Sequence, residues 1–219
     1  MNLQDELKQK SAASAIDFIN HCEVIGIGTG STVDFFIEEL AKHQDLFTTT
    51  VASSIRTEIK LKEFGINVSS LKDVNGIDVY IDGADSCNPL KQLVKGGGGA
   101  LTREKILAHA AKQFICIIDE AKTEDYLGKF PVPIEVLPFA RSQVAKEIVK
   151  LKGNPVMRIG FTTDNGNEIL DVHNWVISNP IELEQTLNNI PGVICNGIFA
   201  LDAADLVLIG TKDKVSICD

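Results

Sequence analysis

Residues 24–32 read VIGIGTGST, an apolar run that breaks into glycines and hydroxyl side chains. The run Val24–Ile27 predicts a short strand, and a helix follows the glycine turn to about Leu40. A strand, a glycine turn and a helix in this order form the first part of a βα unit. The stretch therefore favours a fold of alternating strands and helices.

The same alternation continues to about residue 128. Helices are predicted at residues 3–19, after Ser54 as far as Phe64, and after the glycines 96–99. Further strands are predicted at residues 47–52, 66–68, 77–81 and 114–118. The run FICII at 114–118 is apolar throughout, which is typical of a strand buried on both faces of a parallel sheet. We therefore predict a doubly wound, mostly parallel, Rossmann-like α/β domain.

The pattern changes at GKFPVP, residues 128–133. Strands are predicted at 134–137, 156–161, 168–173 and 193–200, and helices at 140–151 and 180–188, with an Asn-Gly turn in residues 163–167. This β-α-β-β-α-β order predicts a smaller ferredoxin-like α+β domain. The apolar strand 206–210 is expected to return to the first sheet. The predicted domains are residues 1–128 plus 206–219, and residues 129–205.

Charge and composition limit the class of protein. The 219 residues carry a formal net charge of −9, with one Trp, two Tyr and no run of basic residues, which disfavours nucleic acid or an acidic membrane surface as partner. No apolar run approaches the roughly 20 residues of a membrane span, and the first residues lack a signal-peptide pattern. The five cysteines are scattered and the four histidines lack metal-ligand spacing. We therefore expect reduced thiols, a cytoplasmic location and no metal site.

An α/β sheet binds ligands beyond the carboxyl ends of its strands, and four polar stretches of this sequence fall at such ends. They are Gly28–Thr32, Ser53–Ser54, Asp82–Asp85 and the loop that starts at Lys95.

The first stretch lacks the third glycine of a dinucleotide fingerprint, and no acid follows the second strand, so a nicotinamide or flavin site is disfavoured. The chain contains no GK[ST], which excludes a Walker loop. A turn that holds one small phosphate and an ordinary capped helix start remain equally open.

Glu104 lies within the apolar face of its predicted helix when residues are placed at 100° intervals. Such an acid is either paired with a cation in a structural bridge, which is commoner in general, or held for chemistry. Asp82 and Asp85 are either an Asx-turn pair or site acids, and Lys95 supplies a cation ten residues after Asp85. Together these groups suit proton abstraction next to a carbonyl, with donors that stabilise an enediolate.

These motifs resemble the ribose-5-phosphate isomerase family, type A, over essentially the whole chain. The matching segments are GTGST (28–32), SS (53–54), DGAD (82–85), KGGGGA with REK (95–105), GKFP (128–131), TDNGN (163–167) and IPGV (190–193).

The resemblance implies interconversion of D-ribose 5-phosphate and D-ribulose 5-phosphate in the non-oxidative pentose phosphate pathway, without a cofactor or metal. It implies Glu104 as general base, with Asp82, Asp85 and Lys95 as the other catalytic residues. It also implies homodimers or homotetramers, assembled largely through the smaller domain. The substrate-binding residues implied are Thr29, Gly30, Ser31, Thr32, Asp82, Gly83, Ala84, Asp85, Lys95, Gly96, Gly97, Gly98 and Lys122.

The chain departs from the family pattern DGADE at Ser86, which we expect to adjust the loop without loss of activity. Two other functions fit the sequence less well. A non-catalytic sugar-phosphate sensor domain of a transcription regulator would need a DNA-binding element, yet only about 20 residues precede the first strand. A nicotinamide-dependent dehydrogenase would need the third glycine of the fingerprint and an acid after the second strand, and this chain has neither.

Overall fold

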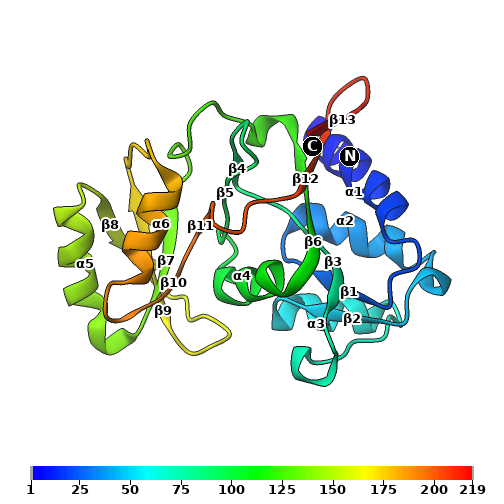
Figure 1. Ribbon diagram of the computed structural model, residues 1–219, viewed down its shortest axis with the longest axis horizontal. Coiled ribbons are helices and arrows are strands. Elements are labelled where there is room, and N and C mark those ends of the chain that lie inside the picture. The colour runs from blue at the N-terminus through cyan, green and yellow to red at the C-terminus, as the bar shows by residue number, and fades with distance from the viewer. Residues whose placement is uncertain (1, 219) are drawn as a thin grey trace. The chain divides into compact units, whose positions relative to one another are not determined.

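In the computed structural model, which describes residues 2–218, six strands form one sheet in the order β13-β12-β6-β3-β1-β2 (Figure 1). They are β1 (Val24–Ile27), β2 (Thr49–Ala52), β3 (Ile77–Asp82), β6 (Ala111–Asp119), β12 (Leu206–Gly210) and β13 (Val215–Cys218). All neighbouring pairs are parallel except β12 with β13. The predicted doubly wound, mostly parallel sheet is confirmed.

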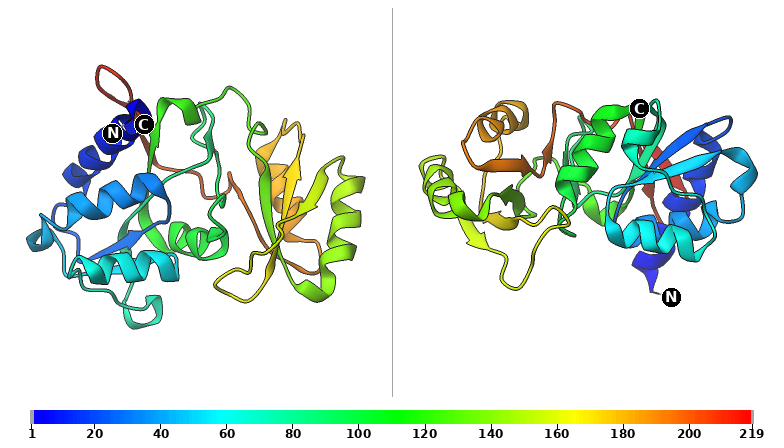
Figure 2. Two further views of the ribbon diagram at one scale, coloured as in Figure 1. Left: turned by 180° about the vertical axis from the view of Figure 1, so that it is seen from behind. Right: turned by 90° about the horizontal axis from the view of Figure 1, so that it is seen from below.

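Helices cover both faces of this sheet (Figures 1 and 2). The helices α1 (Leu3–Ser14) and α2 (Ser31–Leu40) pack against each other and against β6 on one face. The helix α3 (Ile55–Glu63) and the part of α4 (Leu101–Ala110) that follows Thr102 lie on the other face. Because both faces are covered, residues such as Ile25, Ile81 and Ile117 are completely buried. The 3₁₀ turns of the chain are η1 (Ala15–Phe18), η2 (Gln44–Leu46), η3 (Leu71–Asp73), η4 (Glu120–Lys122) and η5 (Pro138–Ala140).

The end of the chain returns to the first sheet, as predicted, because β12 pairs with β6 in parallel. The helix α1 packs on β12, and a Cβ atom at Gly210 would lie 1.9 Å from the carbonyl oxygen of Leu7. Only a glycine permits so close an approach of helix and strand.

A second sheet has the order β10-β7-β9-β8, with every pair antiparallel. Its elements are β7 (Val132–Val136), α5 (Arg141–Lys150), β8 (Asn154–Met157), β9 (Glu168–His173), α6 (Pro180–Asn188) and β10 (Val193–Asn196). This is the strand order of a split βαβ unit, so the predicted ferredoxin-like architecture is confirmed. Val136, Ile148 and Leu187 lie in its buried core.

Three strands of two residues form a small third sheet: β4 (Ser86–Cys87), β5 (Leu93–Val94) and β11 (Ile198–Phe199). The strand predicted at 193–200 is therefore two strands, which separate at Gly197, where a Cβ atom would lie 2.3 Å from the carbonyl oxygen of Lys95. The strand predicted at 66–68 is a single bridge between Thr50 and Val68.

The chain divides into two units. The first contains residues up to Ala84, Arg103–Lys122 and residues from Ala204; the second contains Asp85–Thr102 and Thr123–Ala203. Residues 85–102 group with the second unit because β5 pairs with β11, whereas the sequence placed them in the first domain.

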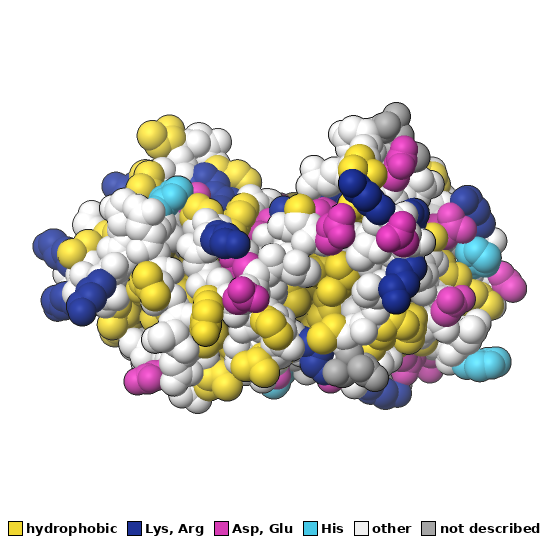
Figure 3. Space-filling model, turned by 90° about the horizontal axis from the view of Figure 1, so that it is seen from above, with side chains coloured by type: hydrophobic (Ala, Val, Ile, Leu, Met, Phe, Trp, Pro, Cys, Tyr) yellow, Lys and Arg dark blue, Asp and Glu magenta, His cyan; other side chains and the backbone are white. Residues whose placement is uncertain are grey.

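Among residues 2–218, no helix combines the length and apolar character needed to cross a bilayer. On the face shown in Figure 3, acidic and basic side chains are interspersed with hydrophobic ones.

Candidate active site

Three of the four polar stretches begin at one edge of the first unit's sheet. Ile27, the last residue of β1, is paired with Ala52 of β2 and with Ile81 of β3. The residues that follow, Gly28, Ser53 and Asp82, are therefore neighbours at the carboxyl edge. The sequence placed these three stretches correctly.

Asp82 is completely buried at the end of β3. Its Oδ1 atom accepts hydrogen bonds from the backbone N–H groups of Thr29, at 3.0 Å, and Gly83, at 2.7 Å. A Cβ atom at Gly28 would lie 1.9 Å from Cγ of Asp82, so the turn after β1 approaches this carboxylate as closely as a backbone can. The carboxylate is thus held in one orientation.

Tyr80 lies two residues earlier on β3, is completely buried and donates a hydrogen bond from its hydroxyl to Oδ2 of Asp82. Burial, and then the charges of Asp82 and Glu104, raise the pKa of Tyr80 well above its ordinary value. The phenol therefore stays protonated and remains a donor to Asp82. Tyr80 was not among the predicted site residues, although a buried tyrosine hydroxyl needs a polar partner.

Glu104 is only 2% exposed in α4, and its charge acts on Tyr80. Ala100, Leu101, Leu107 and Ala108 are buried with it, as the helical spacing predicted. Ala111, the last residue of that predicted face, instead begins β6, because α4 ends at Ala110. A carboxylate on this apolar face is withdrawn from water.

The turn after β1 contains a cluster of hydroxyl groups. Oγ1 of Thr29 lies 2.8 Å from Oγ of Ser53, 2.8 Å from Oγ of Ser54 and 3.0 Å from Oγ1 of Thr57. Ser54 is also the N-cap of α3, since its Oγ accepts the N–H of Thr57 at 3.0 Å. The two serines of the second polar stretch therefore hold the side chain of Thr29 in the first stretch by hydrogen bonds.

The helix α2 begins without a side-chain cap, because its N-cap residue is Gly30 with φ at 135°. Ser31 is exposed and Thr32 is buried in its first turn. Nζ of Lys8, on α1, donates to Oγ of Ser31 at 3.0 Å. Lys8 was not predicted, because no spacing pattern links residues 23 positions apart. The ammonium group of Lys8 and the uncapped N-terminus of α2 together favour the binding of an anion at this turn.

Other predicted residues of the first unit lie at the same sheet edge. Gly83 and Ala84 follow β3 directly, and both are half-buried. Lys122 ends η4, which follows β6, and is also half-buried.

In the second unit, Asp85 is joined to the glycine loop, Gly96–Gly99. Oδ2 of Asp85 accepts the N–H of Gly97 at 2.8 Å, and the N–H of Gly99 donates to the carbonyl of Gly96 at 2.9 Å. Gly97 and Gly98 are exposed, while Gly96 and Gly99 are buried. The N–H groups of Gly97 and Gly99 therefore donate their hydrogen bonds to acceptors within the protein.

Lys95 precedes the glycine loop and is 2% exposed. Its N–H donates to the carbonyl of Gly197 at 2.9 Å, and Nζ lies 5.5 Å from the ring centre of Phe199. The aromatic face adds electrostatic stabilisation to a buried ammonium group. Ser86, the departure from the family pattern, is buried in β4, where its residue pairs with Val94.

A buried carboxylate, Glu135 on β7, supports the end of this loop. It accepts hydrogen bonds from Oγ1 of Thr102, from Oγ1 of Thr163 at 2.8 Å and from Nδ2 of Asn167 at 2.8 Å. The turn at residues 163–167 and the start of α4 are thus held by one side chain. No group of three or more His, Cys, Asp or Glu side chains suited to a metal ion occurs among residues 2–218.

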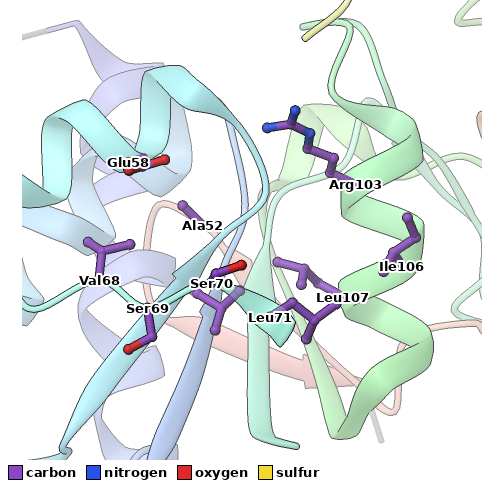
Figure 4. Close-up of a pocket in the computed structure, with 10 residues that line it drawn as sticks. Ala52, Glu58, Val68, Ser69, Ser70, Leu71, Arg103, Ile106 and Leu107 are labelled. Carbon is purple, nitrogen blue, oxygen red and sulfur yellow. The ribbon is translucent and has the colours of Figure 1, made fainter. Parts of the chain in front are cut away.

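A pocket of about 410 Å³ lies between α3 and α4 in the first unit. Figure 4 shows Glu58 and Arg103 extending into it from the two helices, above apolar residues that include Val68 and Leu107. Neither Asp82 nor Glu104 lines this pocket.

Comparisons with known proteins identify the family of the chain. The family model described as ribose 5-phosphate isomerase A (phosphoriboisomerase A) matches residues 49–214. The chain belongs to the ribose 5-phosphate isomerase A family. Membership of this family makes it an isomerase of sugar-phosphate metabolism.

Relatives of the isomerase family match over nearly the full length. A ribose-5-phosphate isomerase A of Francisella tularensis subsp. novicida is 57% identical, covering 97% of this chain and 95% of the relative. The crystal structure of ribose 5-phosphate isomerase A from Neisseria gonorrhoeae is 46% identical with a TM-score of 0.96, covering 99% and 97% of the two chains. A D-ribose-5-phosphate isomerase in complex with phospho-erythronic acid is 42% identical with a TM-score of 0.94, covering 99% of both chains.

Proposed function

We propose that this isomerase interconverts D-ribose 5-phosphate and D-ribulose 5-phosphate through an enediolate, with Glu104 as general base, in the non-oxidative pentose phosphate pathway. The observation that carries the proposal is the burial of Glu104 near Tyr80, whose partner Asp82 is also buried. A carboxylate shielded from water and next to fixed donors suits removal of a carbon-bound proton.

The proposed reaction conserves atoms and charge. The Glu104 carboxylate removes the proton on C2 of the open-chain aldose, and the C1 carbonyl oxygen becomes the enediolate oxygen. Glu104, whose bound proton exchanges with solvent, then protonates C1, while the proton of the C2 hydroxyl moves to the oxygen on C1, which gives the ketose. Lys95 donates to the developing negative oxygen, and Asp82 and Asp85 accept and return hydroxyl protons during ring opening.

The substrate phosphate is assigned to the turn Thr29–Thr32, with Lys8 and Lys122 as cations. The uncapped start of α2 and the contact between Lys8 and Ser31 support this assignment. Gly83, Ala84 and Gly96–Gly98 are assigned to the walls around the sugar. The ligand of the related structure, phospho-erythronic acid, combines a phosphate with a planar carboxylate, which resembles an enediolate.

The test is turnover of ribose 5-phosphate by the purified protein with chelator and without nicotinamide cofactor. We expect ketose to form, and in D₂O we expect the C2 hydrogen to exchange. Glu104→Gln should abolish both while ribose 5-phosphate still binds, and Glu63→Gln, at an exposed position of α3, should change neither. Binding without turnover by the unaltered protein would contradict the proposal and favour a sensor.

We further propose that the protein is a homodimer or homotetramer assembled through its second unit. Phe139, Ile159 and Val176 of this unit are each at least 90% exposed, which is unusual for large apolar side chains. Light scattering at micromolar concentration should give a multiple of the chain mass, and a single-chain mass would contradict the assembly. A cytoplasmic location is proposed because no disulfide joins any of the five cysteines. Fractionation of the source cells tests it.

A further inference from the structure

Arg158, which follows β8, connects a carboxylate on β9 with the glycine loop of the second unit. Its Nε and Nη2 donate to the two carboxylate oxygens of Asp171 at 2.8 and 2.5 Å. Its Nη1 donates to the carbonyl oxygen of Gly97 at 3.1 Å, and Nη1 and Nη2 each lie 3.5 Å from that of Gly96. One guanidinium therefore uses both edges of its planar fork.

The same guanidinium stacks on an aromatic ring that also contacts the loop. Its central carbon lies 5.3 Å from the ring centre of Phe161. A Cβ atom at Gly99 would lie 2.1 Å from Cζ of Phe161, so the ring packs directly on the loop backbone. The loop is thus held through two carbonyls at one end and through Gly99 at the other.

A loop of four glycines needs such support. Gly96 and Gly99 have φ values of 99° and 82°, which glycine adopts without strain, but each glycine also loses more conformational freedom on ordering than any other residue. The peptide group between Gly96 and Gly97 is held at both ends, because its oxygen faces Arg158 and its N–H donates to Asp85. Rotation of this peptide group would break the hydrogen bond to Asp85 and move the backbone next to Lys95.

We propose that Arg158 is a positioning residue, which fixes the glycine loop and thereby Lys95 and Asp85. The proposal rests on the catalytic roles proposed above for Lys95 and Asp85. Within the glycine loop Arg158 contacts backbone carbonyl oxygens, so the role proposed for it is exerted through the loop. A lysine in its place would keep the charge opposite Asp171, yet a single ammonium cannot reproduce the planar fork.

Arg141 provides a matched control. It also pairs with a carboxylate on β9, Glu168, with 3.2 and 3.1 Å between Nη1 and the two oxygens, and it makes no contact with the glycine loop. The side chain of Arg158 is 18% exposed and that of Arg141 is 38% exposed. Replacing either residue by alanine removes one arginine–carboxylate pair from the same sheet.

The first experiment measures hydrogen exchange of the peptide that covers residues 95–101, and does not depend on catalysis. In Arg158→Ala and Arg158→Lys we expect exchange at least about tenfold faster, since each opening costs less free energy. Arg141→Ala should leave this peptide unchanged. Unchanged exchange in both Arg158 variants would overturn the proposal, independently of the proposed catalytic roles.

The second experiment measures kcat and KM for ribose 5-phosphate well below the unfolding temperature of each variant. We expect kcat to fall about 10- to 100-fold in Arg158→Lys, because a small displacement of catalytic groups has effects of this size, with KM changed much less. In the Lys95→Ala background the same substitution should have little further effect. If Arg158→Lys is as active as the unaltered enzyme, the positioning role of Arg158 is overturned and the proposed function stands. If the unaltered protein itself is inactive on ribose 5-phosphate, the proposed function is contradicted.

Discussion

The hydroxyl of Tyr80 donates a hydrogen bond to the carboxylate of Asp82, and both side chains are completely buried. Tyr80→Phe removes this donor, so that Oδ2 of Asp82 loses one hydrogen bond in a buried position. We expect the free energy of unfolding to fall by about 1–3 kcal/mol in urea denaturation at pH 7. Tyr126→Phe, at a position 78% exposed, should have no measurable effect.

The raised pKa of Tyr80 gives this prediction a pH dependence. A folded-state pKa above the unfolded value means that folding favours the protonated phenol, so the stabilisation is complete at neutral pH. It declines once the pH exceeds about 10, where the tyrosine of the unfolded chain ionises. The stability difference between the protein and Tyr80→Phe should shrink there; a constant difference would contradict the assignment.

Gly28→Ala tests the close approach of the first turn to Asp82. The added methyl group would overlap the carboxylate, so the turn or Asp82 must move, and we expect a loss of about 1–3 kcal/mol of stability together with most of the activity. Gly76→Ala is the matched control, because no atom lies within 4 Å of its added Cβ. Equal thermal unfolding of the two variants would show that the approach at Gly28 is looser than described.

Lys95→Ala should lower kcat for ribose 5-phosphate more than it raises KM, because the proposed donor acts on charge that develops in the transition state. Steady-state kinetics at several substrate concentrations separate the two effects. Lys129→Ala, at an exposed position of the second unit, should leave both parameters unchanged. A rise in KM alone would assign Lys95 to substrate binding.

Asp78 lies at the opposite end of β3 and gives a prediction for acid stability. Hydrogen bonds from Lys112, at 2.7 Å, and from the N–H groups of Val24 and Glu23 lower the pKa of this carboxyl. A lowered folded-state pKa stabilises the fold above the unfolded value near 4, and this contribution is lost as the pH falls through the folded value. Asp78→Asn should cost about 1 kcal/mol at pH 7, a modest value because the group is partly exposed. The cost should shrink as the pH falls below about 4, and a cost that did not change with pH would contradict the assignment.

Periodicity and glycine punctuation were sufficient to predict the parallel sheet, the ferredoxin-like sheet and the return of the strand at 206–210, but not the final strand β13. These signals are strong because residues 114–118 of β6 and residues 206–209 of β12 are continuous apolar runs in strands that lie in the interior of the sheet. The two-residue strands β4, β5 and β11 carry no periodicity, so their sheet, and with it the grouping of residues 85–102, was not predictable.

The site was predictable where neighbouring strand ends bring residues together, as for Thr29, Ser53 and Asp82. Lys8 and Arg158 were not, because each reaches its partner through a long side chain across tens of residues of sequence. Tyr80 is an intermediate case: its strand was predicted and alternate residues of a strand share a face, but the spacing does not show that its hydroxyl reaches the carboxylate of Asp82.

The close packing of Leu7 on Gly210 has a consequence for the order in which the chain folds on the ribosome. The helix α1 is synthesised first, but β12, the strand on which it packs, is among the last segments to emerge. The four strands of the second sheet all lie between Val132 and Asn196, so that sheet can be complete while the first still lacks β12. A chain truncated after residue 200 would therefore contain all four strands of the ferredoxin-like sheet but lack β12 and β13 of the parallel sheet.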